Sequence, residues 1–171
     1  LDTFEQDQFS LELQVSGTAV EDRLTWLVGV YGFEEDGENI NPVDFTTVSI
    51  QSGGYFDYSS EAAFAQATFD FTEKLSATAG IRYTKEDRDY LPDQYIEEMP
   101  LGGLPFPCFN SDGSTKVCAL GDRVVPFETV NNSISESTPM LSVSYSFTDD
   151  VMLYGTYSEG FKVGGFTQRI F

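Results

Sequence analysis

Few side chains in this sequence are suited to catalysis or to metal binding. The chain contains no histidine, so it lacks the commonest zinc ligand and the general base of the serine and cysteine hydrolases. Its acidic residues fall mainly in predicted connectors, for example at 34–36 and at 97–98, where a solvated surface or the binding of cations would explain them. We therefore expect a protein that is not an enzyme and has no catalytic residues, no metal site and no cofactor.

The two cysteines are the clearest pair of reactive side chains. Cys108 and Cys118 lie close together in a connector rich in glycine and proline. A short-loop disulfide is expected there in an oxidising compartment, whereas a two-thiol metal site would lack further ligands. A disulfide would stiffen the connector by limiting its unfolded conformations.

An aromatic group could bind a planar ligand. Tyr55, Phe56 and Tyr58 follow a Gly-Gly pair and are predicted to lie in a long loop. Their rings could stack on a catecholate or a porphyrin. Packing within the loop or against a membrane interface is the alternative role, so we treat these residues as ligand-binding candidates.

The net charge excludes one class of partner. The chain has 9 basic and 28 acidic residues, which give a formal charge of -19. Nucleic-acid binding depends on clustered basic side chains that neutralise phosphates. We therefore expect no nucleic-acid partner.

The elements that position these residues are long amphipathic strands. Over residues 75–84, Leu75, Ile81 and Tyr83 share one face, and Arg82 and Thr84 share the other. This period of two recurs in the segments 9–16, 24–33, 65–71, 141–147 and 151–158. The sequence therefore predicts an all-β fold with about six strands.

The connections between these strands alternate between short and long. The joins near 20–22, 72–74 and 148–150 are tight, whereas the segments 36–57 and 90–134 are long. Short periplasmic turns and long extracellular loops are typical of an antiparallel up-and-down transmembrane β-barrel. Rings near the tight turns would then form a membrane-interface girdle: Phe69, Phe71, Tyr145 and Phe147.

A soluble β-sandwich is the alternative fold, because its strands alternate in the same way. Sandwich strands usually have about 5–6 residues and apolar rows rich in Val and Ile, whereas these rows contain Ala, Gly and Tyr. Small membrane barrels have about eight strands, so six strands of this kind are expected to belong to a larger barrel.

Two separate segments resemble TonB-dependent outer-membrane receptors. Residues 62–85 resemble a barrel hairpin that recurs in this family, and residues 154–166 are similar to a later strand that ends in Gly-Phe-Lys-x-Gly-Gly-Phe. Residues 9–17 are similar to a third family strand. The resemblance implies that residues 1–171 form part of a barrel of the type with about 22 strands, without the family's plug domain or its TonB-contacting box.

The resemblance also implies a function and a set of partners. The protein would lie in the outer membrane of a Gram-negative bacterium, in contact with its lipid, with the TonB complex and with its own plug. It would import ferric siderophores or similar nutrient complexes. Arg82 would face the plug or the passing substrate, together with the other polar residues of the same row: Glu12, Gln14, Gln66 and Asp70.

Three other functions stay open on the sequence alone. A passive porin would conduct solutes without an energised inner membrane. A soluble β-sandwich binding module would fold without detergent, which is not expected of a sheet with a charge-free face. An outer-membrane enzyme would need a nucleophile and a base, which are hard to assemble without histidine.

Overall fold

The computed structural model describes residues 2–45, 48–99, 107–110 and 112–166. Six long antiparallel strands form the main sheet: β1 (Thr3–Ala19), β2 (Leu24–Asp44), β3 (Ser49–Asp70), β4 (Leu75–Pro92), β8 (Val130–Thr148) and β9 (Val151–Ser158). A short strand, β5 (Tyr95–Glu98), also pairs with β3, and β6 (Cys108–Phe109) and β7 (Thr115–Lys116) form a separate small sheet. No helix among the described residues is long and apolar enough to cross a membrane.

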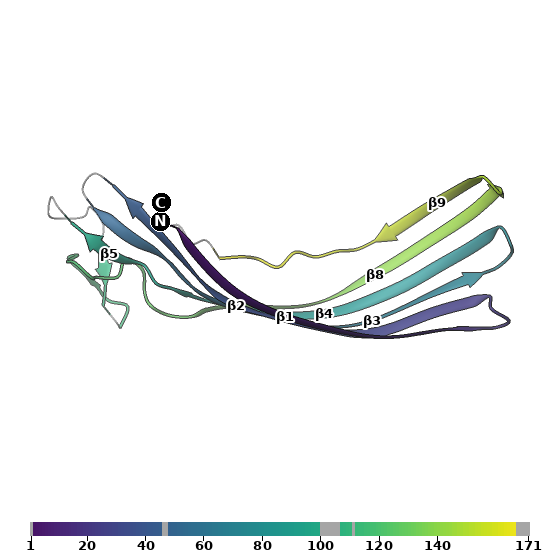
Figure 1. Cartoon of the computed structure of the whole chain (residues 1–171), viewed down its shortest axis with the longest axis horizontal. Coiled ribbons are helices and arrows are strands. Elements are labelled where there is room, and N and C mark those ends of the chain that lie inside the picture. The colour runs from purple at the N-terminus through teal and green to yellow at the C-terminus, as the bar shows by residue number, and fades with distance from the viewer. Residues whose placement is uncertain (1, 46–47, 100–106, 111, 167–171) are drawn as a thin grey trace.

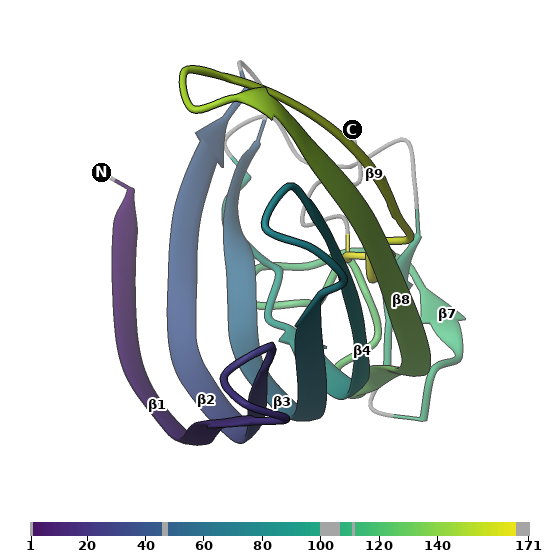
Figure 2. The ribbon, with the colours of Figure 1, turned by 90° about the vertical axis from the view of Figure 1, so that its right-hand side faces the viewer.

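The long strands lie side by side in chain order, β1-β2-β3-β4-β8-β9, as expected of an up-and-down sheet (Figure 2). All six strands predicted from the alternating pattern are present. The sheet bows along its strands, and the chain that follows β9 returns over its hollow side (Figure 1). We call the side under this returning segment the concave face and the opposite side the convex face.

The strand register assigns side chains to these two faces. Cross-strand neighbours share a face, and successive residues of one strand alternate between faces. One row on the concave face consists of Gln14, Gly29, Phe64, Arg82 and Thr138. The adjacent row on the convex face consists of Leu13, Val30, Ala63, Tyr83 and Ser137.

The apolar side chains of the convex face are exposed instead of packed. Leu13 is 65% exposed and Ile81 is 55% exposed, although both sit in the middle of long strands. No second sheet covers this face within the described part of the chain. The soluble β-sandwich is therefore the wrong alternative, because its apolar rows would meet across two packed sheets.

The predicted long connector over residues 36–57 is wrong. β2 runs to Asp44 and β3 starts at Ser49, so most of this segment is paired strand. Its acidic and glycine-rich sequence is typical of a loop, but every residue from Gly37 to Asp44 has a register partner on β3. Gly53 allows β3 to lie close to β2 at this point, because a Cβ on residue 53 would collide with the backbone of Asn39.

The tight turns lie at the other end of the sheet. Between β3 and β4, the Thr72 hydroxyl oxygen accepts hydrogen bonds from the backbone N–H groups of Lys74 and Leu75. Aromatic pairs flank two of the turns, with Phe69 on Phe71 at 5.0 Å and Tyr145 on Phe147 at 4.9 Å between ring centroids. These rings occupy the positions expected of an interface girdle.

The described part of the connector between β4 and β8 folds into a small structure of its own, which we call the cap (residues 93–99, 107–110 and 112–129). Its buried apolar residues pack against the start of β3, and the core they form consists of Val48, Ile50, Ile96, Cys108, Cys118 and Val124. Backbone hydrogen bonds stabilise the cap, for example the one that the Ile96 N–H donates to the backbone carbonyl oxygen of Asp122 at 3.0 Å. The predicted long loop is therefore present but has its own core.

Candidate functional site

The concave face carries a pocket of about 630 Å³ near the end of the sheet away from the tight turns. Strands β2, β3, β4 and β8 form its wall, and the segment after β9 forms its other side. The side chains and backbone that line it come from Tyr31, Phe33, Glu35, Tyr58, Ser59, Ser60, Arg82, Thr84, Glu86, Arg88, Thr138 and residues 159–163. We call it the concave-face pocket.

The segment after β9, residues 159–166, leaves the sheet and crosses the concave face (Figure 1); we call it the strap. Pairing with β8 ends where Glu159 N–H donates to the Pro139 oxygen at 3.1 Å, because proline has no N–H to return that bond. The strap is then fixed by packing: Val163 is only 5% exposed, and Phe166 stacks on Tyr90 at 5.7 Å.

Aromatic rings hold both arginines of the pocket. The Arg82 guanidinium lies 5.3 Å from the ring centroid of Tyr31 and 5.4 Å from that of Phe64. Its Nε–H donates to the Thr84 hydroxyl at 3.2 Å. Arg88 lies 5.3 Å from the Tyr58 ring and 3.1 Å from the Glu86 carboxylate. Ring contacts of this kind orient a guanidinium while leaving N–H donors available to a ligand.

The pocket differs from the rest of the chain in charge. Its lining includes the bases Arg82, Arg88 and Lys162, which balance three acids, Glu35, Glu86 and Glu159, in a chain whose formal charge is -19. Guanidinium groups bind carboxylate-type oxygens through charge-assisted hydrogen bonds, and the surrounding rings offer stacking surfaces. The arrangement can therefore hold a polar ligand that carries anionic oxygens and flat groups.

The predicted aromatic group of Tyr55, Phe56 and Tyr58 does not form as one cluster, and it is not in a loop. All three residues lie on β3, where alternation separates them. Tyr55 is on the convex face, whereas Phe56 and Tyr58 are on the concave face, 5.2 Å apart. Of the three, only Tyr58 lines the concave-face pocket.

The other predicted polar residues share the concave face with Arg82 but lie outside the lining of its pocket: Glu12, Gln14, Gln66 and Asp70. Sequence reasoning missed Tyr31, Arg88 and Lys162. Strand pairing brings Tyr31 and Arg88 near Arg82, and the strap brings Lys162 into the same pocket. The sequence signals that could have identified these residues are the strand register and the position of Pro139, after which the strap leaves the sheet.

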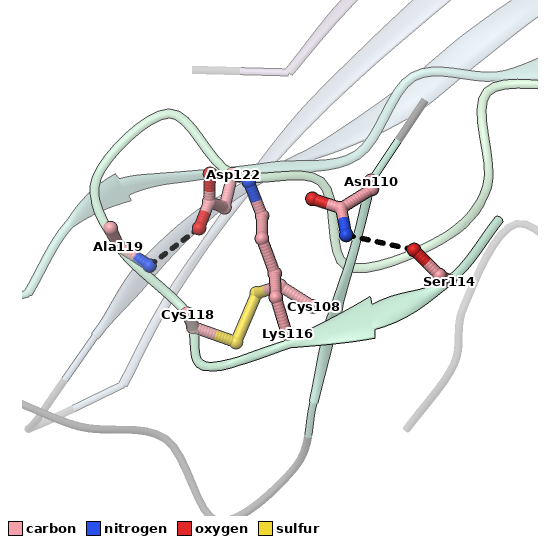
Figure 3. Close-up of polar contacts among 7 residues, drawn as sticks. All are labelled: Cys108, Asn110, Ser114, Lys116, Cys118, Ala119 and Asp122. Atoms are coloured by element: carbon pink, nitrogen blue, oxygen red, sulfur yellow. Dashed lines mark hydrogen bonds and ion pairs between the residues drawn. A yellow bond between two sulfur atoms is a disulfide. The ribbon is translucent and has the colours of Figure 1, made fainter. Parts of the chain in front are cut away.

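The cap contains the two cysteines, and their sulfur atoms are bonded to each other (Figure 3). Beside them, the Asp122 carboxylate accepts a hydrogen bond from Ala119 N–H at 2.7 Å and pairs with the Lys116 ammonium at 2.7 Å. The Lys116 contact holds the pKa of Asp122 below its usual value. Within the described ranges, no group of three or more His, Cys, Asp or Glu residues could hold a metal ion.

Comparisons with known proteins give one family and one fold neighbour. A family model described as TonB-dependent-receptor-like β-barrel matches residues 2–171. The crystal structure of the ferric yersiniabactin uptake receptor FyuA from Yersinia pestis superposes with a TM-score of 0.67 at 16% identity, over 91% of this chain and 21% of that one. This chain thus spans about a fifth of that receptor's length. A search of curated proteins finds no match.

Proposed function

This chain belongs to the β-barrel family of TonB-dependent receptors, and on that premise we propose that the intact protein imports a scarce nutrient complex across the outer membrane of a Gram-negative bacterium. The observation that carries the proposal is the family match over residues 2–171. The fold agrees with it, since the antiparallel sheet has one apolar exposed face and one polar face. The family is one of receptors and not of enzymes.

In this proposal the sheet is one part of a barrel wall. The convex face lies against lipid, and the concave face lines a lumen that holds a plug, in a barrel of about 22 strands. The plug and the remaining strands belong to the intact protein, and the TonB complex supplies the energy for transport. The concave-face pocket then opens toward the extracellular entrance, because the tight turns mark the periplasmic end.

We further propose that the cargo is a ferric siderophore or a similar complex that offers anionic oxygens. The bases and rings of the concave-face pocket support this, because they suit chelates with carboxylate or catecholate groups. FyuA, the fold neighbour, is described as a ferric yersiniabactin uptake receptor, which makes siderophores the first ligands to test.

The test is uptake by the intact receptor in cells that lack their own siderophore receptors. Radiolabelled iron is supplied with a panel of siderophores, with and without an active TonB complex. We expect accumulation of one chelate class, and none without TonB. Equal flux of small solutes with and without TonB would identify a passive porin instead.

A pair of variants tests the pocket itself. Arg82→Gln removes a pocket charge, and Lys74→Gln removes a charge at the opposite end of the sheet. Losing one charge-assisted hydrogen bond, about 1.5–3 kcal/mol, corresponds to roughly 10-fold to 100-fold weaker binding of the chelate. We expect this for Arg82→Gln and wild-type affinity for Lys74→Gln. Equal affinities in the two variants would remove Arg82 from the binding site.

A further inference from the structure

One edge of the main sheet has no partner along part of its length. β9 ends at Ser158, which pairs with Met140, whereas β8 extends well beyond this point to Val130 (Figure 1). Within the described residues, the part of β8 before Pro139 therefore faces no strand on this side. We call this part, residues 130–138, the open edge of β8.

The open edge presents backbone groups that another strand could pair with. The Pro139 oxygen points away from β4, because it accepts the hydrogen bond from Glu159 N–H. Backbone groups in a strand point alternately to its two sides, so those of Ser133, Ser135 and Ser137 point the same way as those of Pro139. An unpaired edge of this kind is a ready template for an extended segment.

The strap has the sequence of a strand that continues β9. Leu153 and Tyr157 of β9 lie on the convex face, and the apolar period of two continues in the strap with Phe161 and Val163. Lys162 falls between these two residues and would therefore share the polar, concave face. The strap is thus suited to pairing although it is not paired.

The register of β8 and β9, continued past Pro139, matches the strap to the open edge. Lys162 would face Glu136, and opposite charges stabilise such a cross-strand pair. Val163 would face Ser135 on the convex face. The strap itself is therefore the occupant that best fits the open edge.

The position in which the strap is observed, which we call the docked position, depends on few contacts. Val163 is buried, and Phe166 stacks on Tyr90. Asn132 Nδ2 donates a hydrogen bond to the Gly164 oxygen at 3.2 Å. These contacts hold the strap over the concave face while the backbone groups of the open edge stay without a strand.

We propose that the strap is a gate of the concave-face pocket, and that it exchanges between the docked position and a paired position in which residues 159–165 extend β9 along the open edge. In the docked position residues 159–163 form one side of the pocket, so pairing removes that side and opens the pocket. The hinge is at Gly160, where a Cβ would meet no atom within 4 Å. The purpose of the gate depends on the proposed import function, whereas its movement does not.

Disulfide cross-linking in the intact receptor tests whether the paired position exists. Ser135→Cys with Val163→Cys places the two thiols at facing positions of the continued ladder, where Cα atoms lie about 5.5 Å apart, within reach of a disulfide. In the docked position Val163 is buried over the concave face, whereas Ser135 belongs to the convex face. The control is Ser135→Cys with Lys162→Cys, because in the paired position residues 135 and 162 lie on opposite faces.

We expect mild oxidation to link residue 135 to residue 163 and not to residue 162. No link to residue 163 would overturn the proposal, because the paired position would then not form. Equal links to both residues would also overturn it, because the strap would then move without a fixed register.

Labelling of a buried pocket residue tests whether this movement opens the pocket. Thr84 lines the concave-face pocket but is only 4% exposed while the strap is docked. Thr84→Cys is treated with a water-soluble maleimide, alone and together with the cross-link between residues 135 and 163, and labelling at residue 84 is read by peptide mass spectrometry. If the paired position holds about 10% of the molecules or less, the cross-link should raise the labelling rate about tenfold or more.

An unchanged labelling rate at residue 84 would show that the strap does not gate the pocket. Heat-modified mobility in gels verifies that each variant folds, so that faster labelling is not a loss of the barrel. Neither measurement uses a cargo or the TonB complex, and both therefore stay informative if the import proposal fails.

Discussion

The belt and the cap use apolar residues in opposite ways. On the convex face of the strands, which we call the belt, apolar side chains point outward and stay exposed, as with Leu13 and Ile81. In the cap, Ile96, Cys108 and Val124 are almost fully buried. The cap therefore has a core that is shielded from water, whereas the apolar side chains of the belt need a nonpolar medium to cover them.

The belt and the cap obtain their stability from different sources. Strands that span a membrane satisfy their backbone groups through pairing and leave their apolar faces to lipid. The cap is a long connector outside the paired strands of the main sheet, and it is held by a small core and a disulfide.

The largest effect is expected in the cap core. Ile96 is 1% exposed, and Ile96→Ala leaves a cavity that should destabilise the cap by about 2–5 kcal/mol. Hydrogen exchange of cap amides in the intact receptor measures this. Leu13→Ala, on the belt, is the control and should leave cap exchange unchanged, since Leu13 lies on the exposed convex face. Unchanged exchange in Ile96→Ala would mean that the cap is not held by this core.

The next effect tests the belt. Ala65→Arg places a charge on the convex face, and Gln66→Arg places it on the concave face one residue away. An arginine facing lipid near the middle of the membrane costs about 2–4 kcal/mol, whereas one facing a wet lumen costs little. Equilibrium refolding into lipid vesicles measures both variants. Equal stability would contradict the assignment of the convex face to lipid.

Removing the disulfide should have a somewhat smaller effect. The bond closes a short loop, with a sequence separation of 10 residues, for which the chain-entropy relation gives about 3 kcal/mol as an upper value. The double variant Cys108→Ser with Cys118→Ser should make the cap cleavable by proteases at lower concentration while the barrel keeps its heat-modified mobility. Protease resistance equal to wild type would assign cap stability to the apolar core alone.

The strands were largely predictable because apolar and polar residues alternate with a period of two within each strand. Leu75 to Thr84 alternate cleanly, and this reflects only the local geometry of one strand. The extension of β2 and β3 was not predictable, because Gly53 and the acids of 34–36 are typical of loops and only their partners make them strand. Pairing across strands is a property of two segments and not of one.

The concave-face pocket was predictable only in part. Arg82 was identified as a candidate because it is a charged side chain in a predicted strand, and Tyr58 because it belongs to an aromatic group in a predicted loop. Tyr31 and Arg88 join them through register, and Lys162 through the strap that begins after Pro139. The proline within β8 was the available signal, because it limits pairing with the next strand.

The smallest effect concerns the charge pair of the cap. The hydrogen bond from Lys116 lowers the pKa of Asp122 relative to its value in the unfolded chain. A lowered pKa adds stability above the unfolded value, near 3.9, and this stability disappears as the pH falls through the folded value. Lys116→Gln should move the pKa of Asp122 back toward its usual value. Titration of the Ala119 amide signal in alanine-labelled receptor measures the shift, because Ala119 N–H donates to this carboxylate. An identical titration in wild type and Lys116→Gln would show that Lys116 does not set the pKa of Asp122. The backbone hydrogen bond from Ala119 would then be the contact that makes the stability of the cap depend on pH at this carboxylate.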